Sequence, residues 1–295
     1  MTADVKALNK KATGDIKGVD IVSDEEGRQY HIGLAKGDLT ENIILVGDPA
    51  RPNLVKHLFS EIYFETQVRE FLTITGRIGE TDISIMSTGI GPSNIEICMV
   101  EIMQICKSPT IIRAGSCGGL QLYLNIGDLV ISTGSVRFED TSLYFIPEGY
   151  PAIADWEVIL ALGEAARKKN YSYHIGLSAS GSGFYGAQGR DIPGLPVKNP
   201  NAINYLTQVN VLNFEMEAST LFNLAQISGL RSGMVSTVFA NRVTNEFITN
   251  EFKHDAEINC VKTAIDAITI LEQMDQEKTK HKSRYWSPKM KIPNK

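Results

Sequence analysis

The sequence predicts a single α/β domain with a largely parallel or mixed central sheet flanked by helices. Short apolar segments alternate with segments of helical periodicity along the chain, which is the pattern of strands separated by helices. Most glycine-rich and polar motifs directly follow the apolar segments, and sheets of this class bind ligands beyond the carboxyl ends of their strands. No internal repeat or low-complexity linker divides the 295 residues.

In the first half of the chain, apolar runs and turn signals mark strands that lead into helices. Residues 43–46 form an apolar run that ends at Asp48-Pro49, so we expect a buried strand there. Residues 70–75 and 82–88 alternate between apolar and polar side chains, which predicts a strand pair. The glycine turn that follows this pair opens a helix at about 93–106.

The second half continues the same alternation. Apolar strands are expected at 110–113 and 128–132, and a periodic helix at 154–169 has basic residues in its last turn, which is favourable at a helix C-terminus. The remaining expected elements are strands at 174–180, 208–214 and 234–239 and helices at 216–228 and 251–275.

Three segments are expected: a polar extension at residues 1–28, one domain at 29–276, and a basic tail at 277–295 that is solvated or docks on a partner. The composition, with 43% hydrophobic and 21% charged residues, is that of an ordinary globular protein. No segment approaches the roughly 18–20 apolar residues of a membrane helix, and the first residues lack a signal-peptide core. We therefore expect a cytoplasmic location and no membrane partner.

Charge and metal-ligand spacing exclude further classes. The formal charge of −5 gives no electrostatic reason to expect a nucleic-acid partner. The scattered histidines include no H-E-x-x-H motif, so we expect no metal site. Free buried thiols in a reducing compartment are expected for the four cysteines, which have no C-x-x-C spacing: Cys98, Cys106, Cys117 and Cys260.

Residues 183–190 place an amide and a guanidinium two residues apart behind an aromatic ring, Phe184. In an extended segment, Gln188 and Arg190 point to the same side. Gln offers a donor and an acceptor, whereas Arg offers only donors. Together they suit a flat ring that carries carbonyls and a ring N–H, such as uracil. Taken alone, the segment is equally well explained as a glycine-rich surface turn with an incidental Arg.

Three arginines follow or flank glycine-rich turns: Arg51 in G-D-P-x-R, Arg69 in R-E-F, and Arg113 before A-G-S. Arg makes bidentate pairs with phosphate oxygens, and glycine turns expose backbone N–H groups that cradle anions. The hydroxyl of Ser116 adds a donor. One such Arg alone is better explained by a structural ion pair, but three indicate a site for a small oxyanion such as inorganic phosphate. The pattern matches neither a P-loop nor a dinucleotide-binding motif.

Glu215, Met216 and Glu217 follow an apolar strand and open a helix. An acidic residue at a helix N-terminus complements the dipole, which explains one Glu. Two carboxylates flanking a Met also suit a ribose, because carboxylates accept hydrogen bonds from its hydroxyls while Met packs on the sugar face. A paired-carboxylate glycosidase is rejected because successive residues diverge in direction, so both carboxylates cannot easily flank one bond.

The motifs G-D-P-x-R, R-E-F, S-T-G-x-G, I-R-A-G-S, E-M-E and F-Y-x-x-Q-x-R together resemble the nucleoside phosphorylase-I family, from about His31 to Lys262. The Q-x-R element resembles the uridine branch of that family rather than the purine branch. The resemblance implies a single α/β domain with a mixed, partly barrel-like sheet. It implies pyrimidine salvage by the reversible reaction of uridine with phosphate, which gives uracil and ribose 1-phosphate. Phosphate is then a co-substrate, and no cofactor or metal is expected.

The resemblance also implies roles for individual residues. The expected phosphate-binding residues are Gly47, Arg51, Arg113 and Ser116, with Arg69 supplied by a neighbouring subunit. The expected ribose-binding residues are Glu215, Met216 and Glu217, with His31 reaching the 5′-hydroxyl across a subunit interface. The expected uracil-binding residues are Phe184, Gln188, Arg190 and Arg242. Catalysis is expected to depend on Arg113, Arg190 and Gln188. Shared sites make a homodimer the minimum working unit.

Two other functions are compatible with this fold: a nucleoside hydrolase, which uses water, and a non-catalytic nucleoside-binding protein. The phosphate arginines argue against the first, and the matched site residues argue against the second. Residues 231–245 contain no Asp, whereas purine members of the family carry one after the late strand, so purine substrates are disfavoured. Two departures are Ala187, where uridine members usually have Gly, and Cys117, where Thr is common.

Overall fold

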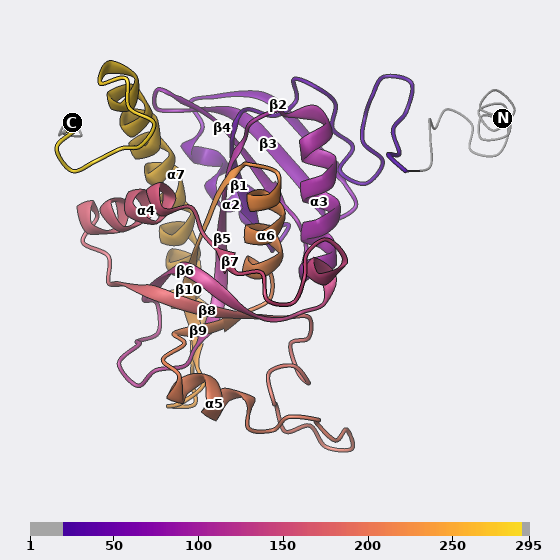
Figure 1. The fold of residues 1–295 in the computed structure, drawn as a ribbon, viewed down its shortest axis with the longest axis vertical. Coiled ribbons are helices and arrows are strands. Elements are labelled where there is room, and N and C mark those ends of the chain that lie inside the picture. Colours follow the sequence, from indigo (N-terminus) through magenta and orange to yellow (C-terminus); the bar gives the residue numbers. More distant parts are fainter. Residues whose placement is uncertain (1–19, 291–295) are drawn as a thin grey trace, which may run out of the picture.

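One mixed sheet of eleven strands forms the centre of the computed structural model, which describes residues 20–290 (Figure 1). The strands are β1 (Asn42–Val46), β2 (Glu61–Val68), β3 (Phe71–Ile78), β4 (Thr81–Ser87), β5 (Thr110–Gly119), β6 (Leu129–Phe138), β7 (Ala152–Ile153), β8 (Tyr173–Gly181), β9 (Asn213–Glu215), β10 (Arg231–Asn241) and β11 (Glu246–Phe247). The predicted pair at 70–75 and 82–88 is confirmed as the antiparallel strands β3 and β4.

The sheet has a closed part and an open part, which meet at β5. Its strand order is β11-β10-β6-β8-β9-β5-β1-β4-β3-β2, and β10 also pairs with β5. This extra pairing closes β5, β10, β6, β8 and β9 into a barrel, while β1, β4, β3 and β2 continue as an open sheet. β1, β5 and β10 run parallel, so their carboxyl ends lie at one edge. The predicted fold class is therefore confirmed, including its partly barrel-like sheet.

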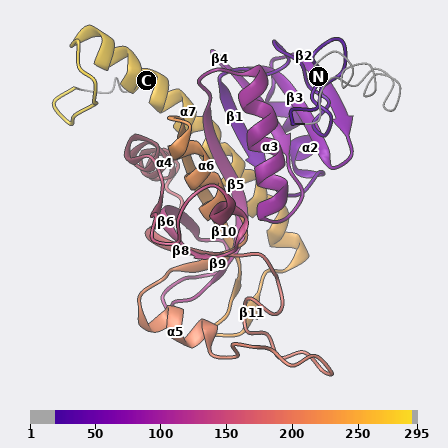
Figure 2. The same cartoon turned by 45° about the vertical axis from the view of Figure 1, so that its right-hand side comes forward.

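Helices cover both faces of the sheet (Figures 1 and 2). They are α2 (Arg51–Val55), α3 (Pro92–Ile105), α4 (Trp156–Lys168), α5 (Ala202–Gln208), α6 (Ala218–Ile227) and α7 (Asn250–Lys280), with 3₁₀ turns η1 (Lys56–Leu58) and η2 (Thr141–Tyr144). α4 and α7 pack on one face, and α3 and α6 pack on the other. No helix in the described part of the chain is long and apolar enough to cross a membrane.

The period of two in a strand explains why the central strands are apolar throughout. Ile44 and Val46 of β1 face the core under α4 and α7, whereas Ile43 and Leu45 face the core under α3 and α6. Successive side chains of a strand point to opposite faces, and both faces are covered here. A continuous apolar run, rather than alternation, is the result.

One predicted strand was wrong. Residues 208–214 were expected to be a strand, but α5 ends at Gln208 and β9 begins only at Asn213. The residues between them turn through Asn210, whose backbone has a positive φ of 60°, a conformation that Asn tolerates better than most residues. The short β9 still delivers Glu215 to its position as the last residue of the strand. β2, α2 and α5 were not predicted.

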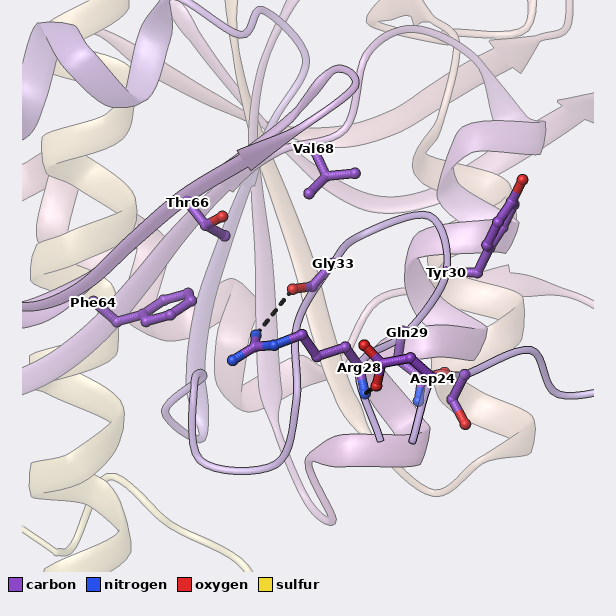
Figure 3. Close-up of a pocket in the computed structure, with 9 residues that line it drawn as sticks. Asp24, Arg28, Gln29, Tyr30, Gly33, Phe64, Thr66 and Val68 are labelled. Atoms are coloured by element: carbon purple, nitrogen blue, oxygen red, sulfur yellow. Dashed lines mark hydrogen bonds between the residues drawn. The ribbon is translucent and has the colours of Figure 1, made fainter. Parts of the chain in front are cut away.

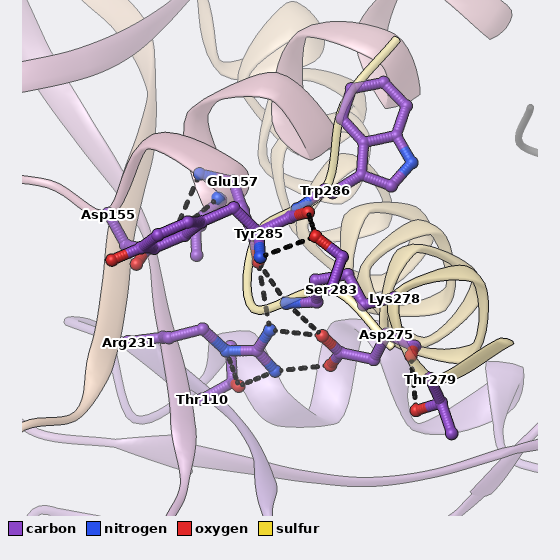
Figure 4. Close-up of polar contacts among 11 residues, drawn as sticks. Thr110, Asp155, Glu157, Arg231, Asp275, Lys278, Thr279, Ser283, Tyr285 and Trp286 are labelled. Carbon is purple, nitrogen blue, oxygen red and sulfur yellow. Dashed lines mark hydrogen bonds and ion pairs between the residues drawn. The ribbon is translucent and has the colours of Figure 1, made fainter. Parts of the chain in front are cut away.

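The C-terminal residues fold back onto α4 (Figure 4). Glu157 is buried and accepts hydrogen bonds from Lys278 Nζ at 2.5 Å and from the Trp286 backbone N–H at 2.9 Å. Arg231 and Asp275 form an adjacent ion pair at 2.8 Å. The predicted tail boundary at residue 277 therefore falls inside α7, and the chain up to residue 290 packs on the domain. The last part of that tail, 291–295, and the first part of the predicted extension, 1–19, lie outside the described residues.

Candidate active site

A cavity of about 620 Å³ lies at the carboxyl ends of β1, β5, β9 and β10. The loop between β8 and α5 extends beyond the same end of the barrel (Figure 2). Residues far apart in the sequence meet here because parallel strands end at a common edge. The predicted site residues that line it are Gly47, Arg51, Arg113, Ser116, Phe184, Gln188, Arg190, Glu215, Met216 and Glu217.

Arg51 is fixed at one end of the cavity. It is only 5% exposed, donates from Nη2 to Glu257 Oε1 at 2.8 Å, and donates from Nη1 to the Ala114 carbonyl at 3.2 Å. Its buried Nε–H has no hydrogen-bond partner among residues 20–290. A buried N–H group without a partner is unfavourable, so this atom is a ready donor for a ligand oxygen.

Arg113 is held in the same way but from the other face of the sheet. Its Nη2 pairs with Glu217 Oε2 at 2.6 Å, and its buried Nε–H also has no partner in the described part of the chain. Glu217 is fixed in turn because its Oε1 accepts the backbone N–H of Gly91 at 2.7 Å. Gly47 leaves room for this guanidinium: a Cβ there would lie 3.2 Å from Arg113 Nη2. Both arginines are thus half of an ion pair, and both keep an unused donor.

Glu215 lines the cavity as well, and protein donors hold both of its oxygens. The backbone N–H groups of Glu217 and Ala218 donate to Oε2 at 2.7 and 2.9 Å, and the Ser180 hydroxyl donates to Oε1. Burial, followed by the charge of Glu217, raises the pKa of Glu215 to about 7, although the three hydrogen bonds act in the opposite direction.

The other end of the cavity holds Gln188 between two guanidinium groups. Arg190 Nη2 and Arg242 Nη1 each donate to Gln188 Oε1 at 3.2 Å. Arginine has only donors, so this arrangement fixes which way the amide points. Within residues 20–290 the Gln188 amide nitrogen makes no hydrogen bond and is left for a ligand. The Arg190 guanidinium lies 4.0 Å from the centroid of the Phe184 ring, which is cation–π geometry.

The two guanidinium groups beside Gln188 carry uncompensated charge. Neither Arg190 nor Arg242 makes an ion pair with any carboxylate in the described part of the chain. Burial lowers the pKa of Arg190, and burial followed by the charge of Arg190 lowers that of Arg242. Arg242 does not itself line the cavity, but it reaches the site through Gln188. A Cβ at Gly118 would lie 3.3 Å from Arg242 Cγ, so the glycine allows this approach.

His31 and Arg69 lie outside the cavity of their own chain. They meet around Tyr30, whose ring centroid is 4.9 Å from that of His31 and 5.3 Å from the Arg69 guanidinium carbon. His31 Nδ1 lies 2.6 Å from Glu101 Oε1, which fixes the ring. Arg69 occupies the turn between β2 and β3 with a positive φ of 53°. The sequence assigned these two residues to the site of a neighbouring subunit, and in this single chain they do not line the cavity.

A second, shallower cavity of about 520 Å³ lies beside Tyr30 (Figure 3). Its lining includes Arg28, which donates to the Gly33 carbonyl at 3.2 Å, and the side chains of Phe64 and Val68. None of the residues predicted to bind phosphate, ribose or base lines it. The predicted site therefore corresponds to the larger cavity.

Sequence reasoning missed several residues that line the larger cavity: Glu70, Asn94, Phe239, Phe247, Lys253 and Glu257. Glu70 stood inside the R-E-F motif, and its Oε1 accepts from Asn94 Nδ2 at 3.1 Å. Lys253 and Glu257 are four residues apart on α7 and so share one face. In the sequence they look like the polar side of an amphipathic helix. The only signal in the sequence that could have identified Lys253 and Glu257 as site residues is this four-residue spacing of a base and an acid.

The fold accommodates the two residues that depart from the family pattern, Ala187 and Cys117. Ala187 does not have a positive φ, so its methyl group causes no backbone strain. Gly181 leaves room for this methyl group, because a Cβ at Gly181 would lie only 3.2 Å from the Ala187 Cβ. Cys117 is buried, and burial raises the pKa of its thiol to about 12. It is therefore a neutral thiol at physiological pH, not a nucleophile.

The family model described as the phosphorylase superfamily matches residues 41–271. The chain belongs to the phosphorylase superfamily. Among curated relatives, the uridine phosphorylase of Thermococcus kodakarensis is 44% identical over 271 residues, which cover 90% of this chain and 95% of that protein. The uridine phosphorylase of Escherichia coli K12 is 33% identical, covering 81% and 96%. A guanosine phosphorylase of Halorubrum lacusprofundi is 29% identical, covering 83% and 99%.

Membership in the phosphorylase superfamily agrees with the family that the sequence motifs indicated. The matched segment begins before β1 and ends within α7, so it contains every strand of the barrel and the whole larger cavity. His31 lies before the matched segment.

Proposed function

We propose that this chain is a pentosyltransferase that catalyses the reversible phosphorolysis of uridine in pyrimidine salvage, giving uracil and ribose 1-phosphate. One observation carries the proposal. A single cavity has unpartnered N–H groups of Arg51 and Arg113 at one end and Gln188 between two unpaired guanidinium groups at the other. Superfamily membership, and two of the relatives above being named uridine phosphorylases, support it.

The end with Arg51 and Arg113 suits phosphate. The free Nε–H of each arginine can donate to a phosphate oxygen, and the Ser116 hydroxyl and the backbone at Gly47 border the same space. The pairs with Glu257 and Glu217 cancel the charge of both arginines. A phosphate dianion would therefore gain from one more cation.

We propose that Arg69 of a second copy supplies that cation, with His31 of the same copy reaching the ribose. Arg69 is exposed, has no ion-pair partner within residues 20–290, and lies beside His31. Two residues that do not line the larger cavity of their own chain are explained if they complete that cavity in a neighbour. The working unit is then at least a homodimer.

The middle of the cavity suits ribose. Glu217 has both oxygens oriented by Arg113 and Gly91 and keeps lone pairs for sugar hydroxyls. Glu215 adds a second acceptor, and Met216 lines the cavity between them. These residues hold the sugar so that its C1′ lies between phosphate and base, and positioning three components together lowers the barrier.

The end with Gln188 suits the leaving base. As the bond between C1′ and the base nitrogen breaks, its electron pair moves onto uracil, and positive charge grows on the ribose. Arg190 and the free amide nitrogen of Gln188 are donors for negative charge on the uracil carbonyls, and Arg242 adds positive charge behind Gln188. Phosphate stabilises the cationic sugar and then forms the new C1′–O bond. Phosphate is the co-substrate, and no step requires a metal, an organic cofactor or a covalent enzyme intermediate.

The four cysteines of the chain are buried free thiols, which suit a reducing compartment, and we place the reaction in the cytoplasm. Uridine, uracil, phosphate and ribose 1-phosphate are then the only small-molecule partners proposed.

The test measures uracil release from uridine by the purified protein, with and without inorganic phosphate, and with inosine and guanosine in parallel. We expect release that requires phosphate and is specific for uridine. Release without phosphate would assign a hydrolase, and equal rates on the purine nucleosides would assign a broad-specificity phosphorylase. If no base is released from any nucleoside, the remaining assignment is a non-catalytic nucleoside-binding protein.

A further inference from the structure

A buried hydroxyl lies directly behind the Glu215 carboxylate. Ser180 is the penultimate residue of β8, and its side chain donates to Glu215 Oε1. The same Oγ accepts the backbone N–H of Ser219, at the start of α6, at 2.9 Å, and lies 2.7 Å from Ser135 Oγ on β6. All of these side chains are buried.

The hydrogen-bonding capacity of Ser180 determines the direction of this network. A serine hydroxyl has one proton to donate and two lone pairs to accept with. With its proton on Glu215, Ser180 accepts from the Ser219 N–H, and its second lone pair accepts the Ser135 hydroxyl. The chain from Ser135 through Ser180 therefore points its protons toward Glu215, the arrangement that matches an ionised carboxylate.

The hydrogen-bond acceptor sites of Glu215 can be counted in the same way. An ionised carboxylate offers about four acceptor sites. Ser180 and the backbone N–H groups of Glu217 and Ala218 fill three, which leaves about one for a substrate hydroxyl. The two backbone donors fix Oε2, so the Ser180 hydroxyl decides how Oε1 is turned.

We propose that Ser180 is a positioning residue that keeps the Glu215 carboxylate ionised and turned so that its remaining lone pair meets a ribose hydroxyl. The proposal rests on the assignment of Glu215 to the ribose in the proposed function. Ser180 itself touches no substrate, because Glu215 lies between it and the cavity.

The charged and titratable groups around Glu215 make its ionisation sensitive to a single donor. Glu217, from the residues that lead into α6, raises its pKa but is itself paired with Arg113 of β5. Cys117 of β5 is a neutral thiol. Glu139, at the end of β6, accepts from the Ser219 hydroxyl at 2.9 Å on the far side of Ser180. With the pKa of Glu215 at about 7, loss of the Ser180 donor moves its titration above the physiological range.

β8 also provides a matched control. Ser178 lies two residues before Ser180, is fully buried, and makes the same kind of contact, with Ser132 Oγ at 2.6 Å. Among the described residues its hydroxyl is not hydrogen-bonded to Glu215, and its partner on β9 is Asn213. Ser178→Ala therefore removes a buried serine pair from the same strand while leaving the carboxylate untouched. Ser135→Ala is an intermediate case, because it removes the outer hydroxyl but keeps the Ser180 donor.

The first readout is the ionisation of Glu215 itself. Protein labelled with ¹³C at glutamate side-chain carboxyls is titrated by NMR, and the Glu215 signal is assigned by its loss in Glu215→Gln. Ser180→Ala is expected to raise the midpoint by about one to two pH units, the scale of one hydrogen bond to a charged group. Ser135→Ala should raise it by less, and Ser178→Ala should leave it unchanged. A midpoint that Ser180→Ala does not move, or that Ser178→Ala moves as far, overturns the proposal.

The second readout is kinetic. Ser180→Ala should raise the KM for uridine by about tenfold or more while the KM for phosphate stays within about twofold, and it should shift the acid limb of kcat/KM upward. Ser178→Ala should do neither. Equal increases in both KM values would indicate a general structural role and overturn the proposal. If wild-type protein releases no uracil, the proposed function fails, but the NMR midpoints still test Ser180.

Discussion

The two ends of the cavity hold their arginines in opposite ways. At the phosphate end, Arg51 and Arg113 are buried, and each is paired with a glutamate at less than 3 Å. At the base end, Arg190 and Arg242 are half-buried, share one amide oxygen, and have no carboxylate partner among the described residues. The first arrangement is built on strands and helices, whereas Arg190 and Gln188 lie on a loop.

The difference follows from the charge that each end is proposed to receive. Phosphate arrives already charged, and arginines that are neutralised in the empty site still direct free N–H groups at it. The leaving uracil gains its charge only as the bond breaks, so uncompensated guanidinium groups act mainly in the transition state. Substitutions at the phosphate end should therefore lower both catalysis and stability, whereas substitutions at the base end should lower catalysis alone.

The largest expected effect is that of Arg113→Ala. It leaves Glu217 buried without its cation, a change that typically costs about 3–5 kcal/mol of stability, and removes a phosphate donor. We expect kcat/KM to fall by about a thousandfold or more, with a raised KM for phosphate and a lowered Tm. Arg231→Ala is the control, because it breaks a partly buried ion pair (Figure 4) at the start of β10, whereas the cavity lies at the carboxyl end of that strand. It should lower Tm but leave the phosphate KM unchanged. Wild-type phosphate dependence of Arg113→Ala would remove Arg113 from the site.

Arg190→Ala tests the other half of the comparison. Removing one donor to a developing anion should lower kcat by about a hundredfold to a thousandfold, whereas the free energy of unfolding should change by less than about 1 kcal/mol because no carboxylate is left unpaired. Arg284→Ala is the matched control for Arg190→Ala. It removes a guanidinium group that lies 5.3 Å from the centroid of a tyrosine ring outside the site. A loss of stability as large as that of Arg113→Ala would show that the two ends are built alike.

The sequence predicts the two ends unequally. Arg51, Arg113 and Arg190 could be predicted because each stands beside a glycine turn or within Q-x-R, whereas Arg242 was expected only from the family resemblance. Glu257 could not be predicted, because it lies 206 residues from Arg51 in the sequence. On its helix it looks like a solvated residue, and only the folded structure brings it to Arg51. The late start of β9 and the helix α5, in which Leu206 is fully buried, depend likewise on packing that local pattern does not reveal.

Glu257→Gln is a second test of the phosphate end, and its expected effect is smaller than that of Arg113→Ala. Gln keeps an oxygen for Arg51 but removes one negative charge beside the phosphate position. We expect the KM for phosphate to fall about threefold to tenfold while stability drops by about 1 kcal/mol, the scale of a buried ion pair replaced by a neutral hydrogen bond. Steady-state rates at varied phosphate and thermal melts measure both. A raised phosphate KM would mean that Glu257 orients Arg51 more than it opposes the anion.

Gln188→Leu tests how the base end selects its substrate. Arg190 and Arg242 lose their shared acceptor but remain as donors, so some uridine turnover should persist. The uracil edge loses the amide nitrogen, and an unpartnered polar edge in a buried site typically lowers discrimination by about tenfold or more. We expect the ratio of uridine to inosine turnover to fall, mainly through the uridine rate. An unchanged ratio would assign base selection to the guanidinium pair alone, and the base end would then work purely by charge.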